Sequence, residues 1–251
     1  MERIDVGGHT LRVDVAGAGP PDFLCLHGLV DALEIWDRLA GPLAERGRVA
    51  RFDQRGHGES DAPPGAYRRE DLAADALAVL DGLGVERAVW VGHSLGGVVA
   101  MAAALAHPER VAGLVLIGTA SHCSGKAAEW YERIASAGET DGTDGLRRAI
   151  YGEKSRRRIH GDAGGIARVA RTLQSLHADP LTPKLPELGS PALLLVGEND
   201  PMGPKASAAI AAQLPDATLE IVPGCGHWLH VEAPDVVIRA YDGWTAGRGA
   251  A

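Results

Sequence analysis

The feature of this sequence that most constrains its fold is a short apolar run that passes through a glycine-rich turn into an alanine-rich stretch. Residues 88–91 (Ala-Val-Trp-Val) are typical of a buried strand, Gly92-His93-Ser94-Leu95-Gly96-Gly97 follows, and residues 98–106 are typical of a helix. Ser94 is therefore expected at a sharp strand-to-helix turn, strained so that its hydroxyl projects above a sheet edge. Only glycine leaves the flanking chain enough room at positions 92 and 96.

The rest of the chain alternates short apolar strands with helical stretches, after an amino-terminal hairpin that contains Leu11, Val13 and Val15. The predicted strands are residues 23–26, 49–52, 88–91, 111–117, 192–196 and 219–222, and the predicted helices lie near residues 36–45, 71–83, 98–106, 205–214 and 235–244. This alternation predicts an α/β fold whose mostly parallel sheet has helices on both faces. Ligands of such sheets bind at the carboxyl ends of the strands, where Ser94 is expected.

The alternation is interrupted between residues 119 and 186, a stretch too long for a loop. We expect these residues to form a helical cap inserted into a core made of residues 1–118 and 187–251.

The cap has a slight excess of positive charge on an otherwise acidic protein. Its arginines include Arg147, Arg148 and the run Arg156 to Arg158, and its glycine-rich segment 138–145 is expected to be mobile. A cap arginine that points inward would favour acidic substrates over neutral esters, because a charge near a partly desolvated pocket acts more strongly than one in bulk water. We therefore predict that the cap controls which substrate is accepted.

Composition excludes several other classes of protein. The chain has 251 residues, enough to bury a sizeable core, and its formal net charge of −8 argues against nucleic acid as a partner. Residues 1–5 hold no apolar signal core and no later run has the length of a membrane helix, so we expect a cytoplasmic protein with no membrane partner and a small-molecule substrate. Cys25, Cys123 and Cys225 lack metal-ligand spacing and are expected to be free thiols.

A serine at such a turn becomes a nucleophile only when a histidine takes its proton and a carboxylate orients that histidine. Asp200 follows the strand 192–196, and His227 follows the strand 219–222 and a glycine-rich turn. We assign Asp200 as the acid and His227 as the base, with Glu198 and His230 as the competing candidates.

An oxyanion formed during attack by Ser94 needs two backbone N–H donors. One is expected from Leu95, directly after the serine, and the other from Leu29, in the loop after the strand 23–26. The loop residues His27-Gly28 let the backbone turn inward there.

Several motifs in register resemble the α/β-hydrolase superfamily. They are His27-Gly28, Asp53-Gln54-Arg55-Gly56-His57-Gly58-Glu59-Ser60, Gly92-His93-Ser94-Leu95-Gly96-Gly97, Gly197-Glu198-Asn199-Asp200 and Gly226-His227. The resemblance implies an eight-stranded sheet with the cap after the sixth strand. It also implies a structural tight turn at residues 53–60, in which Arg55 bonds backbone carbonyls.

Within that superfamily the chain is most similar to enol-lactonases, esterases, cofactor-free haloperoxidase-like enzymes and meta-cleavage-product hydrolases. Members of the last group usually have Asn before and Met after the serine, where this chain has His93 and Leu95. Superfamily dehalogenases and epoxide hydrolases use an aspartate nucleophile, so Ser94 excludes their chemistry.

The resemblance and the candidate residues together predict a serine hydrolase that cleaves a small ester or lactone through an acyl-enzyme, without a metal or cofactor. The residues expected to line its substrate pocket are His27, Asp31, Trp36, His93, Trp130 and Trp228. Two alternatives stay open: a carbon–carbon bond hydrolase or lyase with the same triad, and a non-catalytic ligand receptor with this fold.

Overall fold

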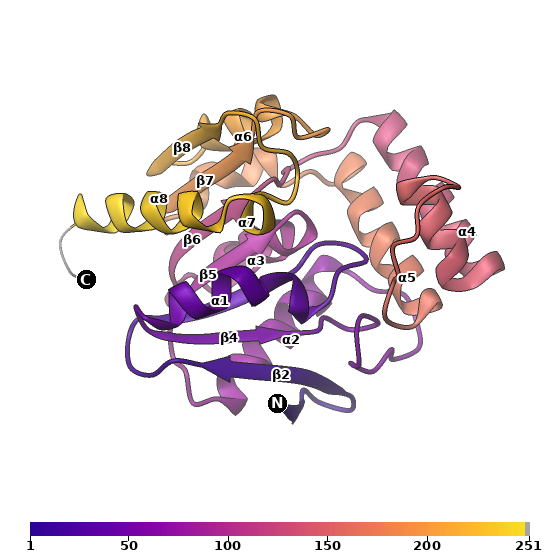
Figure 1. Cartoon of the computed structure of the whole chain (residues 1–251), viewed down its shortest axis with the longest axis horizontal. Coiled ribbons are helices and arrows are strands. Elements are labelled where there is room, and N and C mark those ends of the chain that lie inside the picture. Colours follow the sequence, from indigo (N-terminus) through magenta and orange to yellow (C-terminus); the bar gives the residue numbers. More distant parts are fainter. Residues whose placement is uncertain (249–251) are drawn as a thin grey trace.

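The computed structural model describes residues 1–248 and contains one eight-stranded sheet in the order β1-β2-β4-β3-β5-β6-β7-β8 (Figure 1). The strands are β1 (Glu2–Asp5), β2 (Thr10–Ala16), β3 (Asp22–Leu26), β4 (Arg48–Phe52), β5 (Ala88–His93), β6 (Val111–Ile117), β7 (Ala192–Gly197) and β8 (Ala217–Val222). β2 pairs antiparallel with β1 and β4, and every other neighbouring pair is parallel. The expected α/β-hydrolase fold, including the amino-terminal hairpin, is confirmed.

Helices cover both faces of this sheet. They are α1 (Asp37–Ala44), α2 (Arg69–Gly82), α3 (Leu95–Ala106), α4 (Gly125–Tyr151), α5 (Ala163–Gln174), α6 (Pro204–Ala211), α7 (Leu229–Glu232) and α8 (Pro234–Ala246). Alternate residues of the central strand β5 point to opposite faces, so Trp90 packs with α2 and α3 while Val91 packs with α1 and α8. This strand is fully buried, and Ser94 directly follows its last residue, His93.

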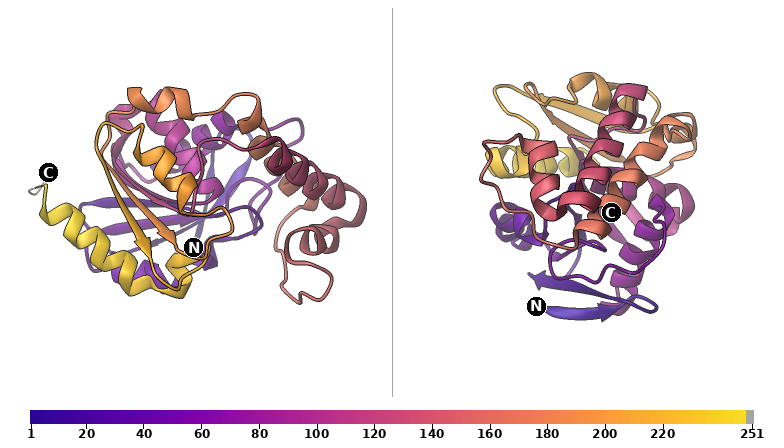
Figure 2. Two further views of the ribbon diagram at one scale, coloured as in Figure 1. Left: turned by 90° about the horizontal axis from the view of Figure 1, so that it is seen from above. Right: turned by 90° about the vertical axis from the view of Figure 1, so that its right-hand side faces the viewer.

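The segment between β6 and β7 contains α4 and α5, which pack against each other (Figure 2). Residues 138–145, expected to be a mobile segment, belong to α4, which kinks at Gly142 with φ 63° and ψ −150°. Gly138 and Gly145 are buried there, and a Cβ on Gly145 would lie 2.0 Å from the Ala137 carbonyl oxygen. These glycines permit close packing where the chain folds back on itself.

Among residues 1–248, no helix is both long and apolar enough to cross a membrane. The three cysteines are free thiols, as expected. Cys25 lies in the buried strand β3, and burial raises the pKa of its thiol to about 12, so it is inert as a nucleophile at neutral pH.

Candidate active site

Ser94 lies in a strained backbone conformation between β5 and α3. Its φ of 51° and ψ of −112° fall outside the regions that residues with a side chain ordinarily adopt. The conformation is held by the Ser94 N–H, which donates to Ile117 O (2.9 Å), and by the Thr119 hydroxyl, which donates to Ser94 O (2.7 Å). The strained turn predicted for Ser94 is present.

Two glycines permit this turn. A Cβ on Gly96 would lie 2.0 Å from Leu26 O, and one on Gly92 would lie 2.5 Å from Gly96 O. Because backbone atoms cannot give way at such distances, the predicted requirement for glycine at both positions is confirmed.

Asp200 and His227 meet beyond the carboxyl ends of β7 and β8. His227 Nδ1 lies 2.8 Å from Asp200 Oδ2, and Asp200 Oδ1 accepts the Met202 N–H at 2.8 Å. Both oxygens of this fully buried carboxylate are therefore bonded, and His227 Nδ1 carries the proton. Glu198 is exposed and instead accepts the Gly224 N–H at 3.1 Å.

Gly118 closes the space behind this pair. A Cβ there would lie 2.8 Å from Asp200 Oδ2 and 3.2 Å from His227 Nδ1, and its φ of 53° also favours glycine. Sequence reasoning missed Gly118, although its place directly after β6 offered a signal.

The loop after β3 lies against the nucleophile turn. In the described part of the chain the N–H groups of Leu29 and Leu95 have no hydrogen-bond acceptor, whereas the N–H of Val30 donates to His57 Nε2 at 3.3 Å. Val30 has a φ of 64°, an unusual conformation for a β-branched residue, so the His57 contact helps to fix the loop.

His27 anchors the start of the same loop. Its Nε2 accepts the Gln54 N–H at 3.0 Å, and its Nδ1 donates to Gly28 O at 2.8 Å. It is fully buried and does not line the cavity described below, nor does Trp36, which lies in the core against the ring of His230. The expectation that these two residues line the pocket was therefore wrong.

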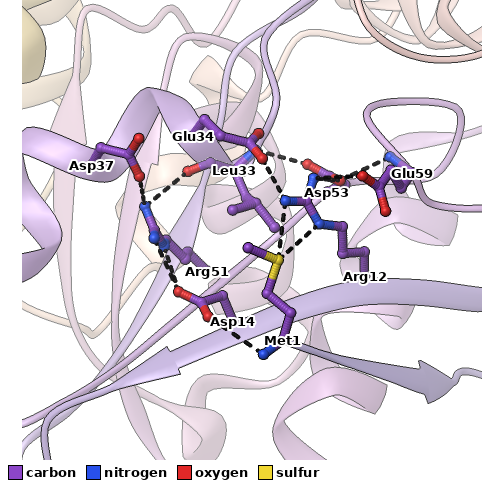
Figure 3. Close-up of polar contacts among 9 residues, drawn as sticks. All are labelled: Met1, Arg12, Asp14, Leu33, Glu34, Asp37, Arg51, Asp53 and Glu59. Atoms are coloured by element: carbon purple, nitrogen blue, oxygen red, sulfur yellow. Dashed lines mark hydrogen bonds and ion pairs between the residues drawn. The ribbon is translucent and has the colours of Figure 1, made fainter.

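Asp53 bonds to the end of the segment that follows this loop (Figure 3). This fully buried carboxylate accepts the N–H groups of Leu33 (2.7 Å) and Glu59 (2.9 Å) and pairs with Arg12 at 3.2 Å. It thus ties the end of β4 to Leu33, four residues after Leu29, and to Arg12 of β2.

The tight turn expected at residues 53–60 is present. Arg55, however, bonds mainly the Asp75 carboxylate, at 2.6 and 2.7 Å, and only one backbone carbonyl, that of Asp71, at 3.1 Å.

A cavity of about 250 Å³ opens onto Ser94 and His227. The expected pocket residues Asp31, His93, Trp130 and Trp228 all line it. The structure adds apolar and aromatic residues that sequence reasoning had not assigned to the pocket: Val30, Tyr131, Ile150, Tyr151, Leu173 and Met202. Most of these come from α4 and α5, so their positions depend on how the inserted helices fold over the sheet.

The cap arginines lie outside this cavity. Arg148 pairs with Asp141 at 2.6 Å, and Arg147 donates to Ser155 O at 2.7 Å. Arg157 stacks on the rings of Tyr151 (4.9 Å) and Trp228 (4.7 Å) and, with Arg158, lines a second cavity of about 610 Å³. Arg157 thus lies against two wall residues of the nucleophile cavity.

Within residues 1–248, no group of three or more His, Cys, Asp or Glu side chains has an arrangement that could hold a metal ion.

A model of the alpha/beta hydrolase family matches residues 23–240. This chain belongs to that family. It is 32% identical over 267 residues to a 2-hydroxy-6-oxononadienedioate/2-hydroxy-6-oxononatrienedioate hydrolase of Klebsiella pneumoniae, covering 92% of this chain and 90% of the relative. It is 29% identical over 258 residues to a 2-(acetamidomethylene)succinate hydrolase of Mesorhizobium japonicum, covering 95% of this chain and 92% of the relative. A malate-bound thermophilic esterase from Thermogutta terrifontis aligns with a TM-score of 0.87 at 28% identity over 98% of both chains.

His230, the competing base candidate, lies in α7 and is fully buried between Trp36 and His93. Neither of its ring nitrogens has a hydrogen-bond partner within residues 1–248, and burial holds its pKa well below the ordinary value. This alpha/beta hydrolase therefore contains a neutral imidazole that contributes packing but no bonds.

We predict that His230→Leu stabilises the protein. An unpaired buried polar group costs about 1–3 kcal/mol, so the free energy of unfolding at pH 7 should rise by about 1 kcal/mol. The gain should increase below about pH 6.5, because the unfolded wild-type chain binds a proton at His230 there while the folded chain does not, which costs about 1.4 kcal/mol per pH unit. Urea unfolding at several pH values measures both effects.

The matched control is His107→Asn, at a half-exposed histidine. It should change neither the free energy of unfolding at pH 7 nor the dependence of that free energy on pH. A gain from His230→Leu that shrinks as the pH falls would contradict the buried neutral state.

Proposed function

We propose that this alpha/beta hydrolase cleaves a small ester or lactone through an acyl-enzyme on Ser94, with His227 as base and Asp200 as its orienting acid. The observation that carries the proposal is the conjunction of the strained Ser94 with the His227–Asp200 pair, 2.8 Å apart, at one cavity. The geometry of that pair leaves His227 Nε2 as the ring nitrogen that can accept a proton.

In the first half of the reaction, Ser94 Oγ bonds to the substrate carbonyl carbon while its proton passes to His227 Nε2. The carbonyl π electrons move to oxygen, and the resulting anion accepts hydrogen bonds from the N–H groups of Leu29 and Leu95. The bond to the leaving oxygen then breaks as that oxygen takes the proton from His227. Water repeats the sequence on the acyl-enzyme and releases the acid.

The cavity limits what can be bound. Sites for small molecules usually measure about 300–1,000 Å³, so a cavity of about 250 Å³ suits a short acyl group. We retain residues 119–186 as the cap that sets this shape. We also retain the prediction that one of its arginines favours acids, although in the described part of the chain none of them lines this cavity and Arg157 contacts only the wall residues Tyr151 and Trp228. The relatives support the latter, since the names of the two hydrolases describe acids and the esterase structure holds malate.

Carbon–carbon bond hydrolysis is the second candidate, because the relative from Klebsiella pneumoniae is named for 2-hydroxy-6-oxo acids of that type. A non-catalytic receptor is less well supported, because binding alone does not require the bonded Asp200–His227 pair beside a strained serine.

Ser94→Ala is predicted to abolish turnover without loss of folding, because removal of a triad nucleophile typically lowers kcat about 10⁶-fold. A panel of p-nitrophenyl esters and lactones gives the rates, and mass spectrometry after treatment with a fluorophosphonate locates the nucleophile. The label is expected on Ser94 alone, with Ser136→Ala, at an exposed serine of α4, as the matched control. Unchanged turnover or labelling in Ser94→Ala would overturn the proposal.

Asp200→Asn is predicted to lower kcat by roughly 10⁴-fold, because the amide no longer fixes the Nδ1–H tautomer of His227. Glu198→Gln should leave kcat within a factor of about two by the rate arithmetic, since Glu198 bonds only a backbone N–H at the surface. The reverse ranking, measured on proteins of equal Tm, would show that Glu198 is the acid.

A further inference from the structure

The ring of His93 lies where three parts of the candidate site meet: the loop after β3, the nucleophile turn, and the loop of residues 223–228, here called the base loop. His93 directly precedes Ser94 in the chain, and its ring centre is 4.7 Å from that of His227. Although it borders the nucleophile cavity, His93 has a relative exposure of 1% and offers a substrate almost no surface. Any contribution of this ring to a reaction is therefore made through the residues that it holds.

One hydrogen bond joins His93 to the base. His93 Nε2 lies 3.0 Å from the backbone oxygen of His227, and because a carbonyl oxygen can only accept, Nε2 is the donor. Within residues 1–248 this oxygen has no other hydrogen-bond partner, and no other hydrogen bond joins residues 92–97 to the base loop. The placement of the base loop against the nucleophile turn thus depends on this contact.

In the described part of the chain, the other hydrogen bonds of the base loop do not reach the nucleophile turn. The Glu232 carboxylate of α7 accepts the N–H groups of Gly226 (2.7 Å) and Trp228 (3.2 Å). The ring of His227 bonds to Asp200 at 2.8 Å. These contacts hold the base and its acid together and to α7, but they leave their placement relative to the serine to the His93 bond.

The ring of His93 is itself held from other sides. Asp31 Oδ2 lies 3.6 Å from its Nδ1, and the ring centre of His230 is 4.4 Å away. A Cβ on Gly28 would lie 2.8 Å from Nδ1, so the backbone of the loop that carries Leu29 packs directly against the ring. A ring enclosed in this way relates the proposed oxyanion donor to the base.

We propose that His93 is a positioning residue, which fixes the base relative to the nucleophile by donating to the backbone oxygen of His227. The His227 ring must lie within hydrogen-bond reach of the Ser94 hydroxyl to take its proton, and a displacement of about 1 Å in such a site can lower the rate about 100-fold. This inference rests on the proposed serine hydrolase chemistry, to which it adds a residue that acts through the base.

The test compares His93→Gln with His93→Met. Both variants lose the ring and have unbranched side chains of equal length, but only the glutamine amide can donate a hydrogen bond to the oxygen of His227. We expect His93→Met to lower kcat about 100-fold while KM changes by less than about threefold, because the base and not the substrate is displaced. His93→Gln should restore kcat to within about fivefold of the wild type by the same rate arithmetic.

The matched control is His230→Leu, which removes a ring that packs on His93 but removes no hydrogen bond of the described chain. Its kcat should stay within a factor of about two of the wild type. A loss as large as that of His93→Met would show that ring packing alone places the base, and would overturn the proposal.

A second measurement needs no turnover. The proton that His227 Nδ1 donates to Asp200 gives a ¹H NMR signal far downfield of the backbone amides, and this signal is lost when the proton exchanges rapidly with water. Its absence in Asp200→Asn assigns it. We expect the signal in the wild type and in His93→Gln, and its loss in His93→Met, because a base loop released from the nucleophile turn admits water.

Together the two measurements separate failure of the inference from failure of the proposed function. A wild-type protein that turns over no ester or lactone, but whose NMR signal is lost in His93→Met and kept in His93→Gln, would support the hold of His93 on His227 and overturn the hydrolase. Turnover through Ser94 with a kcat in His93→Gln no higher than that in His93→Met would overturn the positioning role and leave the hydrolase standing.

Discussion

The close approach of backbone to backbone around Ser94 is the constraint on which the rest of the site depends. The backbone conformation of Ser94, with φ 51°, costs of order 1–3 kcal/mol in a residue that has a side chain. Such a conformation persists only where the surrounding structure fixes it. Here Gly96 lies directly against Leu26 O, and the Ser94 N–H is bonded to Ile117 O. β3, β5, β6 and α3 are thus joined at one point, and the serine hydroxyl cannot relax away from the cavity without separating them.

The strand order brings the other candidate site residues to the same edge of the sheet as Ser94. β3 and β6 flank β5, and β7 and β8 follow β6, all parallel, so their carboxyl ends lie at one edge of the sheet. That edge brings together the Leu29 loop, Ser94, Asp200 and His227 from distant parts of the chain. Two buried histidines link the loop after β3 to the turn after β4. Burial lowers the pKa values of His27 and His57, that of His57 to about 3, so both rings are neutral. Each ring can therefore donate one backbone hydrogen bond and accept another.

The sequence was sufficient to place candidate site residues that directly follow the end of a strand. Ser94, Asp200 and His227 could be selected because each follows an apolar run, and parallel strands place such residues at one edge. It was insufficient where a property depends on tertiary contacts. The segment Gly138 to Gly145 has the composition of a loop but packs as a kinked helix. His27 lies in a loop, but both of its ring nitrogens are hydrogen-bonded, to Gln54 and to Gly28. The ring of His93 contacts a backbone carbonyl 134 residues away, which no local pattern reveals.

A crystal structure of the protein after reaction with a small fluorophosphonate tests the central claim most directly, because the phosphonyl group is tetrahedral like the intermediate of ester cleavage. The account predicts a bond from phosphorus to Ser94 Oγ, with one phosphonyl oxygen about 2.7–3.2 Å from both Leu29 N and Leu95 N. A bond to any other residue, or a phosphonyl oxygen directed away from these two N–H groups, would contradict it.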